Sequence, residues 1–247
     1  MRRAAQGLLA GLLAVLWADA AVATPPNVIL KAVYSEPTDR YAHGILGDAL
    51  EWGALVLTVD QCADCETRQI RKFTLRLPEN RVFEDLEPRI VRDEFSMTYV
   101  MVVETDLELG ARLALYTANG LSHATPFIGR SNRWLAPVGV ADLDGDGVPE
   151  IAYVEKPHLS RELKIWRFHE DRLEFLASQS GLTNHRIGQD FISGGIRDCG
   201  DGLEMITANA DWSGIMATRF DGSRLTTRRI AAFQGREGFA AALDCKF

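Results

Sequence analysis

The sequence predicts an all-β fold, a small β-propeller of about five blades, from three observations. First, a segment that begins with an aromatic residue and ends with aspartate recurs along the chain. Its aspartates are Asp48, Asp93, Asp142, Asp198 and Asp244, separated by 45, 49, 56 and 46 residues. Second, strand-like apolar runs follow the first four copies, and third, turn-forming segments separate these runs from the next. Several short strands repeated at about 40 to 50 residues are typical of propeller blades.

The strand candidates follow the aspartate segments in order. A first strand after each aspartate is expected at residues 54–59, 99–103, 151–154 and 205–208. A second is expected at residues 71–77, 112–116, 163–168 and 215–220. These runs are rich in β-branched and aromatic residues, and turns are expected after them at 118–120, 169–171 and 221–223.

The fifth copy, residues 238–245, is too short to form a blade by itself, because the chain ends two residues later. We expect it to pair as a strand with the N-terminal run 28–34 and so complete a composite blade. Such closure leaves no long edge strand exposed. A four-bladed ring is the alternative, and in both cases residues 24–247 are expected to form one propeller domain.

The segment from Asp142 to Glu150 has the composition of a calcium-binding loop. Asp142, Asp144 and Asp146 occupy loop positions 1, 3 and 5, where a tight wrap would bring three carboxylates to one centre. Val148 would add its backbone carbonyl and Glu150 a fourth carboxylate, and Ca²⁺ prefers such oxygen ligands. Because carboxylates this close repel one another, we expect a bound cation. An acidic hairpin turn without metal is the alternative.

Residues 138–152, in which this loop lies between two apolar runs, resemble the FG-GAP repeat, also called VCBS. The resemblance implies a loop that joins two strands of a propeller blade and binds Ca²⁺ as a structural ion. An EF-hand would instead require Glu at position 12, where this chain has Tyr153. The ninth residue of the FG-GAP loop is usually Asp, so Glu150 departs from that pattern. The whole chain is also similar to small single-domain proteins of proteobacteria that carry such repeats.

The other copies of the aspartate segment keep less of the loop. Residues 198–204 retain Gly-Asp-Gly and a closing Glu204, but the segment is one residue shorter and lacks the middle aspartate. The copy at residues 92–97 has lost its glycines, and residues 48–51 are reduced to a turn. One strong calcium site is therefore expected, and metal binding by residues 198–204 stays open.

Residues 1–23 are expected to be a secretory signal peptide. Arg2 and Arg3 precede an apolar run at 7–18, and small residues permit cleavage after Ala20 or Ala23. A retained anchor is the alternative, but the run is shorter than the roughly 20 residues that span a bilayer. No later segment is long and apolar enough to cross a membrane, so we expect an exported protein, periplasmic or secreted. We also expect it to be a monomer.

The charge balance argues against nucleic acid as a partner. The chain has 27 basic and 34 acidic residues; removing residues 1–23, which contain Arg2, Arg3 and Asp19, leaves 25 and 33, a net charge of −8. Neutralising phosphates requires clustered Lys and Arg. The expected partner is an unidentified protein or small molecule.

Four cysteines in an exported protein favour disulfides. Cys62 and Cys65 form a C-x-x-C motif between two strand-like runs, which predicts a disulfide at a hairpin tip. Thiol–disulfide exchange and a four-cysteine zinc site are the alternatives. Cys199 and Cys245 are then expected to pair, and both directly follow the aspartate of consecutive copies.

Few other residues could carry out chemistry, and no catalytic residue is predicted, because the chain has no G-x-S-x-G, H-E-x-x-H or Gly-rich phosphate motif. A ligand pocket at the channel mouth is a candidate, built from His43, Asp85, His185, Arg186, Asp190 and Ser193. The alternative is that these residues hydrogen-bond the loops between blades. His158 falls in a predicted turn and is expected to be solvated.

Two functions are compatible with these patterns. The first is a calcium-stabilised, non-catalytic binding module. The second is a periplasmic hydrolase whose site lies at the channel mouth. A convergent set of histidines and carboxylates would favour the enzyme over the binding module.

Overall fold

The computed structural model describes residues 27–47, 49–169 and 172–247. The predicted signal peptide, the repeat aspartate Asp48 and part of the turn expected at 169–171 lie outside these ranges. The described residues form antiparallel β-sheets and one short helix, so the all-β class is confirmed. Within the described part of the chain, no helix is long and apolar enough to cross a membrane.

The first sheet contains the N-terminal half of the chain. β2 pairs with β1 and β3, β5 to β8 form a four-stranded meander, and β4 joins the two parts by pairing with both β2 and β6. The strands are β1 (Val28–Thr38), β2 (Glu51–Asp60), β3 (Ile70–Arg76), β4 (Arg81–Phe83), β5 (Arg89–Arg92), β6 (Thr98–Asp106), β7 (Gly110–Thr117) and β8 (Gly120–Ala124).

The second and third sheets contain the C-terminal half. The second is a meander of β9 (Leu135–Ala141), β10 (Glu150–Glu155), β11 (Glu162–Phe168) and β12 (Leu173–Ser180). The third contains β13 (Leu182–Thr183), β14 (Gly195–Asp198), β15 (Leu203–Asn209), β16 (Gly214–Phe220) and β17 (Leu225–Ala232). In it, β14 to β17 pair in chain order and β13 also pairs with β15.

Three meanders, β5–β8, β9–β12 and β14–β17, therefore share one plan of four antiparallel strands in chain order. In each of them the first strand ends at, or directly before, one of the repeat aspartates, Asp93, Asp142 or Asp198. The strands expected after these aspartates are found as β6, β10 and β15, followed by β7, β11 and β16.

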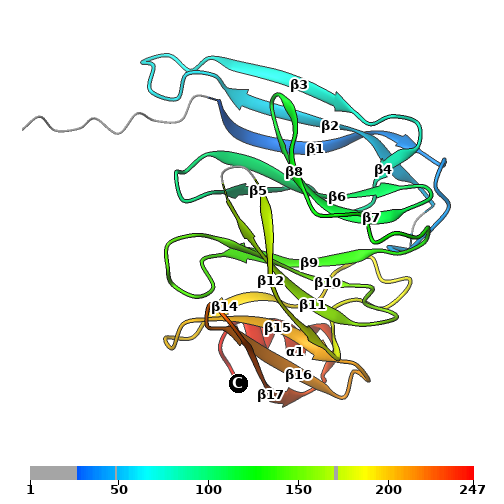
Figure 1. Cartoon of the computed structure of the whole chain (residues 1–247), viewed down its shortest axis with the longest axis vertical. Coiled ribbons are helices and arrows are strands. Elements are labelled where there is room, and N and C mark those ends of the chain that lie inside the picture. Colours follow the sequence, from blue (N-terminus) through cyan, green and yellow to red (C-terminus); the bar gives the residue numbers. More distant parts are fainter. Residues whose placement is uncertain (1–26, 48, 170–171) are drawn as a thin grey trace, which may run out of the picture.

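The sheets are stacked along the long axis of the molecule, with β1–β3 at one end and β14–β17 at the other (Figure 1). Alternation along β6 shows how the layers pack, since successive side chains of a strand point to opposite faces. Val100 and Val102 join the core shared with β2, whereas Met101 and Val103 join the core shared with the second sheet. β6 is buried along its whole length because apolar layers cover both of its faces.

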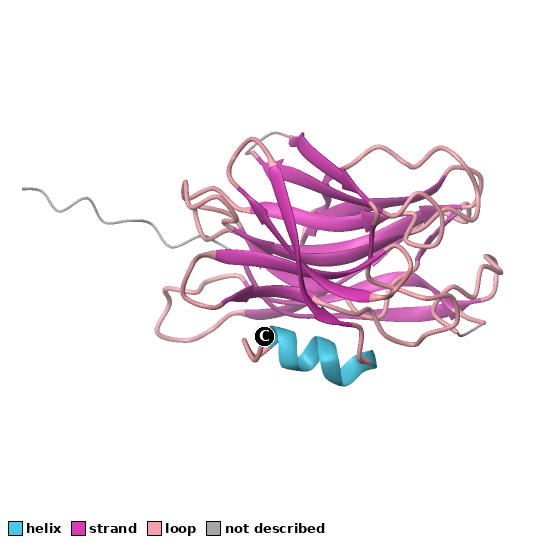
Figure 2. Ribbon diagram, turned by 90° about the horizontal axis from the view of Figure 1, so that it is seen from below, coloured by secondary structure: helices cyan, strands magenta, loops and turns pink. Residues whose placement is uncertain are grey.

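The C-terminal segment is helix α1 (Gly235–Leu243), which covers the outer face of the last sheet (Figure 2). Phe239 and Ala242 of α1 pack against Ile206 and Ile215. The strand expected at 238–245 is therefore wrong, and so is the composite blade, because among the described residues β1 pairs only with β2. The physical reason is the alanine-rich run before Leu243, which favours a helix and places Phe239, Ala242 and Leu243 on one face.

The two expected cysteine pairs lie at disulfide distance. The Cα atoms of Cys62 and Cys65 are 5.4 Å apart in the β2–β3 hairpin loop. Those of Cys199 and Cys245 are 5.7 Å apart and connect the β14–β15 loop to the residue that follows α1 and its C-cap. The second disulfide therefore holds the helix against the sheet that it covers.

Candidate functional site

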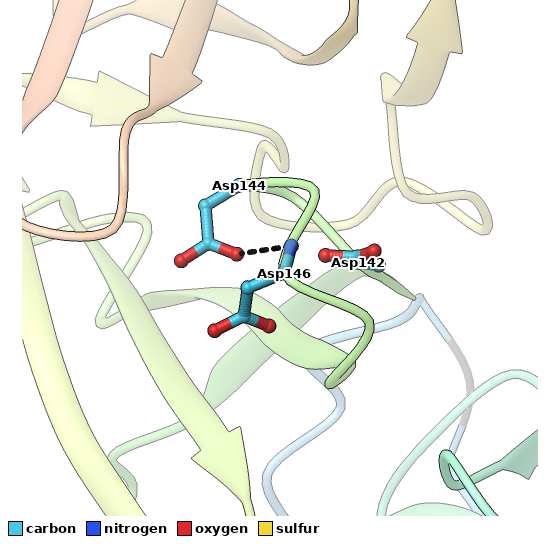
Figure 3. A group of neighbouring side chains, drawn as sticks. All are labelled: Asp142, Asp144 and Asp146. Atoms are coloured by element: carbon cyan, nitrogen blue, oxygen red, sulfur yellow. Dashed lines mark hydrogen bonds between the residues drawn. The ribbon is translucent and has the colours of Figure 1, made fainter.

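The β9–β10 loop brings the three predicted aspartates together. One carboxylate oxygen from each of Asp142, Asp144 and Asp146 lies within 4.8 Å of the others (Figure 3). Gly145 and Gly147 have φ angles of 81° and 95°, which glycine adopts most readily. The N–H groups of these glycines donate to the two Asp142 oxygens, at 2.8 and 2.9 Å. The loop is therefore wound around its own carboxylates.

A cation of the protein already lies beside this loop. Arg167 of β11 donates to Asp144 Oδ2 at 2.6 Å and to Glu150 Oε1 at 2.8 Å, and its guanidinium is 2.9 Å from Asp146 Oδ2. Burial acts to lower the pKa of Arg167, but the bonds to Glu150 and Asp144 outweigh it and the pKa is raised. Arg167 thus neutralises part of the negative charge of the carboxylates, which the sequence pattern alone had led us to expect a metal ion to neutralise.

Glu150, the fourth predicted carboxylate ligand, has a different role. Its side chain is fully buried, Oε2 accepts from the Leu143 N–H at 2.9 Å, and Oε1 accepts from Arg167. Burial raises the pKa of Glu150, and the bonds to Arg167 and Leu143 partly counter that rise. The N–H of Val148 donates to Asp146 Oδ1 at 2.9 Å. The three aspartates are therefore the carboxylates that converge. Glu150 instead holds the loop in place through its hydrogen bonds to Leu143 and Arg167.

The third sheet shows that the glutamate–arginine pair is independent of a calcium loop. Glu150 pairs in register with Arg167 across β10 and β11, and Glu204 holds the corresponding place across β15 and β16, with Arg219 Nε 3.0 Å from its Oε1. Arg197 and Arg228 also bind Glu204. Burial raises the pKa of Glu204, but these arginines outweigh it and lower the pKa. Among the described residues, the loop before Glu204 has no converging carboxylates.

The aspartate loop fits a hard divalent cation by donor type and charge. Three carboxylates within this separation are the oxygen ligands that Ca²⁺ prefers. Four carboxylates and one guanidinium leave a net charge of −3 around the loop. Asp142, Asp144 and Asp146 are the residues that would hold the ion.

A second candidate site is a small pocket of about 200 Å³ beside the start of β9. We call it the histidine pocket. It is lined by His43, Ile45, Asn132, Arg133, Trp134, Lys156, Pro157, His158, Leu159 and Ile187. These residues come from four separate connections of the chain, and Trp134 is buried in the hydrophobic cluster between the first and second sheets.

His43 is held by a buried carboxylate. Its Nδ1 lies 2.5 Å from Glu84 Oε1, and Thr105 Oγ1 donates to Glu84 Oε2 at 2.6 Å. Burial raises the pKa of Glu84, and the bonds from His43 and Thr105 partly offset this. The Trp134 indole N–H donates to the Glu84 carbonyl at 2.8 Å. An ionised Glu84 requires the proton of a neutral His43 to be on Nδ1, which leaves Nε2 as the acceptor.

His158 and His185 form a hydrogen-bonded chain that ends on a backbone carbonyl. His185 Nε2 lies 2.9 Å from the Gln189 carbonyl, and His158 Nε2 lies 3.0 Å from His185 Nδ1. Burial lowers the pKa of His185, and burial together with His185 and His43 lowers the pKa of His158 to about 4. Both rings are therefore neutral at pH 7. Because the carbonyl can only accept, His185 Nε2 and then His158 Nε2 must donate, and His158 Nδ1 carries no proton.

The six residues predicted for a channel-mouth pocket do not form one site. His43 lines the histidine pocket and His185 lies directly behind it. Asp85 is buried against Arg89, with 2.5 Å between Oδ2 and NH1, and burial raises its pKa.

The remaining three predicted residues are also placed apart. The guanidinium of Arg186 lies over the rings of Trp212 and Phe233, at 4.5 and 4.9 Å from their centroids. Asp190 is exposed, and the N–H of Ser193 donates to the Asn184 carbonyl at 2.7 Å.

The sequence did not indicate that Glu84, Trp134 and His158 are parts of a site. His158 was expected to be solvated, but its ring stacks parallel to Trp134, with 6.4 Å between the centroids. Trp134 is the aromatic residue that begins the repeat segment ending at Asp142. Glu84 directly precedes Asp85. The sequence therefore offered two adjacent carboxylates after a strand as a signal, and only Asp85 was predicted as a pocket residue.

Compared with protein-family models, curated proteins and solved structures, the chain matches none of them. The aspartate loop and the histidine pocket are therefore the features of this chain that bear on its function. A fold class alone would not identify an activity, because unrelated functions share folds.

Proposed function

We propose that this protein is a calcium-stabilised, exported binding module built from repeats of the FG-GAP type. The observation that carries the proposal is the convergence of Asp142, Asp144 and Asp146 within 4.8 Å at the repeat position. On this proposal the three meanders are propeller-type blades arranged in series. Bound Ca²⁺ would supply the positive charge that Arg167 provides only in part.

A structural role for the ion is supported by where the loop lies. Asp142 and Asp144 line a cavity of about 470 Å³ together with Asp201, Arg219 and Asp221 of the third sheet. A Cβ atom added at Gly222 would come within 2.9 Å of Asp144 Oδ2. An ion at this loop would therefore order the contact between two neighbouring sheets as well as the β9–β10 hairpin.

Calorimetric titration of the chelated mature protein tests the proposal, and we expect one Ca²⁺ to bind. At about 100 times its dissociation constant, one ion stabilises the folded state by about 2.7 kcal/mol, which raises the melting temperature by several degrees. Asp144→Ala should lose both the binding heat and the stabilisation. Asp64→Ala, at an exposed position of the β2–β3 hairpin loop, is the matched control and should keep both.

No binding heat at millimolar Ca²⁺ would refute the calcium assignment. If Asp144→Ala instead left the melting temperature unchanged but removed a ligand-binding or hydrolytic activity, the loop would belong to a functional site rather than a structural one.

We assign ligand binding to the histidine pocket, because it combines apolar walls with convergent polar side chains. Pockets of this composition are the usual sites for small molecules. Trp134 and His158 contribute stacked ring faces, and Arg133 and Lys156 contribute positive charge.

A hydrolase is the second candidate function, and the His43–Glu84 pair is the observation that favours it. A histidine oriented by a buried carboxylate can act as a general base. None of the lining residues is Ser or Cys, so the base would activate water. Hydrolysis of an activated ester that His43→Ala abolishes, and that His169→Ala at a more exposed site preserves, would support this alternative over the binding module.

A further inference from the structure

We propose that the histidine pocket binds a small 2-hydroxycarboxylate, with the carboxylate on Arg133, the hydroxyl on an imidazole and the carbon chain against the apolar wall. The proposal rests on the assignment of this pocket as the ligand site and adds the chemical class of the ligand. Each part of such a molecule meets a separate group of lining residues.

The anionic end of the ligand is assigned to Arg133. Its NH1 donates to the Asn132 carbonyl at 2.8 Å, and among the described residues Arg133 has no carboxylate partner. Lys156, the other cation that lines the pocket, already has a carboxylate partner, because it lies 3.0 Å from Glu155, which it shares with Lys164. A single guanidinium without a carboxylate partner matches the charge of a monoanion. Its planar pair of N–H donors also matches the two oxygens of a carboxylate.

The hydroxyl is assigned to the imidazole rings, because the N–H proton of each neutral ring is already used in a hydrogen bond to another residue of the protein. His43 faces Glu84 with Nδ1, and His158 faces His185 with Nε2. Each ring in its neutral form therefore keeps one nitrogen that accepts a hydrogen bond. A ligand that carries only a carboxylate would leave these acceptors without a donor, whereas a neighbouring hydroxyl supplies one.

The carbon chain of the ligand is assigned to the apolar side of the pocket. Leu159 and Ile187 line it and are 57% and 71% exposed, so they are free to be covered by a ligand. Ile45 and the buried Trp134 form the inner wall. The volume of about 200 Å³ limits the ligand to a short chain.

The backbone beside the pocket adopts a left-handed conformation at two residues that are not glycine. Asn132 and Lys156 have φ angles of 55° and 48°, in the left-handed region that side chains other than glycine rarely adopt. The Asn132 N–H donates to the Tyr41 hydroxyl at 2.8 Å, which fixes the first of these residues. Such backbone strain concentrates at binding sites, where it positions side chains in advance.

The test is an NMR titration of the calcium-loaded mature protein, observing the histidine ring and tryptophan indole signals. The probes are 2-hydroxybutyrate, butyrate and 2-hydroxybutyramide. We expect 2-hydroxybutyrate to shift the signals of His43, His158 and Trp134. Butyrate should bind about 5-fold more weakly and the amide about 10-fold more weakly, as expected for loss of a neutral and a charged hydrogen bond.

Arg133→Met should weaken 2-hydroxybutyrate binding about 10-fold. Arg71→Met removes the same charge from an exposed position of β3 and should leave the affinity unchanged. Amide binding as tight as that of the acid, or unchanged binding by Arg133→Met, would overturn the carboxylate assignment while the pocket remained a ligand site. Butyrate binding as tight as that of 2-hydroxybutyrate, or tighter, would overturn the hydroxyl assignment. If no probe shifts these signals at about 50 mM, the pocket assignment fails as well.

Discussion

The charge of the aspartate loop depends on Arg167. This guanidinium lies within 2.9 Å of carboxylate oxygens of Asp144, Asp146 and Glu150. Two positive charges at one loop repel each other, so a bound Ca²⁺ and Arg167 compete for the same carboxylates. The calcium affinity of the loop is then set by its own arginine as well as by its ligands.

Arg167→Met is therefore expected to tighten calcium binding about 10-fold, because the competing cation is gone. The calcium-free protein should lose about 3–5 kcal/mol of unfolding free energy, because Glu150 is left buried without its partner. Calorimetry and chelated melting curves measure the two effects. Arg228→Met, which removes one of three arginines from Glu204, is the control and should leave calcium affinity unchanged. Weaker calcium binding by Arg167→Met would show that Arg167 supports the site instead.

His158 connects the histidine pocket to the pH dependence of stability. Its pKa falls from an ordinary value of 6.5 to about 4, through burial and the neighbouring His185, His43 and Arg161. Below pH 6.5 the unfolded chain takes up a proton at His158 that the folded protein does not bind. The contribution of this residue to stability is therefore constant above pH 6.5 and is lost as the pH falls from 6.5 toward 4.

Melting temperatures measured from pH 7.5 to pH 4.5 should fall less steeply for His158→Gln than for the wild type. His185, whose pKa is also lowered, keeps part of the slope in the variant. Identical slopes for the two proteins would mean that His158 takes up its proton equally in the folded and unfolded states.

At the scale of the element, helix α1 replaces the strand that the repeat pattern predicted. Phe239 is 3% exposed and packs with Trp212 and Phe233, with ring centroids 6.3 and 6.2 Å away. Phe239→Ala should lower the unfolding free energy by about 3–5 kcal/mol, the usual cost of removing a buried aromatic ring. Urea denaturation measures this loss. Glu237→Ala, in the exposed first turn of α1, should change stability by less than about 0.5 kcal/mol.

At the scale of the whole molecule, the sheets pack as a series with two different ends. The outer face of β14–β17 is covered by α1, whereas β3, in the first sheet, is mostly exposed. In such an array each layer is stabilised mainly by its neighbours, so a local loss of packing stays local.

Hydrogen exchange of Phe239→Ala should accordingly show reduced protection in β14–β17 and little change in β1–β3. In a closed ring the first and last sheets would be neighbours, and both would lose protection. Equal losses in β1–β3 and β14–β17 would therefore contradict an open series and support ring closure.

The candidate sites were predictable from sequence only where their residues are close along the chain. Asp142, Asp144 and Asp146 lie in one turn, so their spacing alone indicated convergence. The histidine pocket could not be read in this way, because His43 and Glu84 are 41 residues apart and meet only when separate loops pack together. Arg167 was missed because its pairing with Glu150 depends on the β10–β11 register.

The sequence by itself determined the all-β class, the strands that follow Asp93, Asp142 and Asp198, the cysteine pairs and the composition of the aspartate loop. These features follow from local periodicity, turn residues and short-range spacing, which act on neighbouring residues. Only the tertiary structure decided that residues 235–243 form a helix over the last sheet rather than a strand beside β1. The short segment has both the repeat pattern and helix-forming alanines. It forms a helix because this conformation buries Phe239 against the outer face of β14–β17.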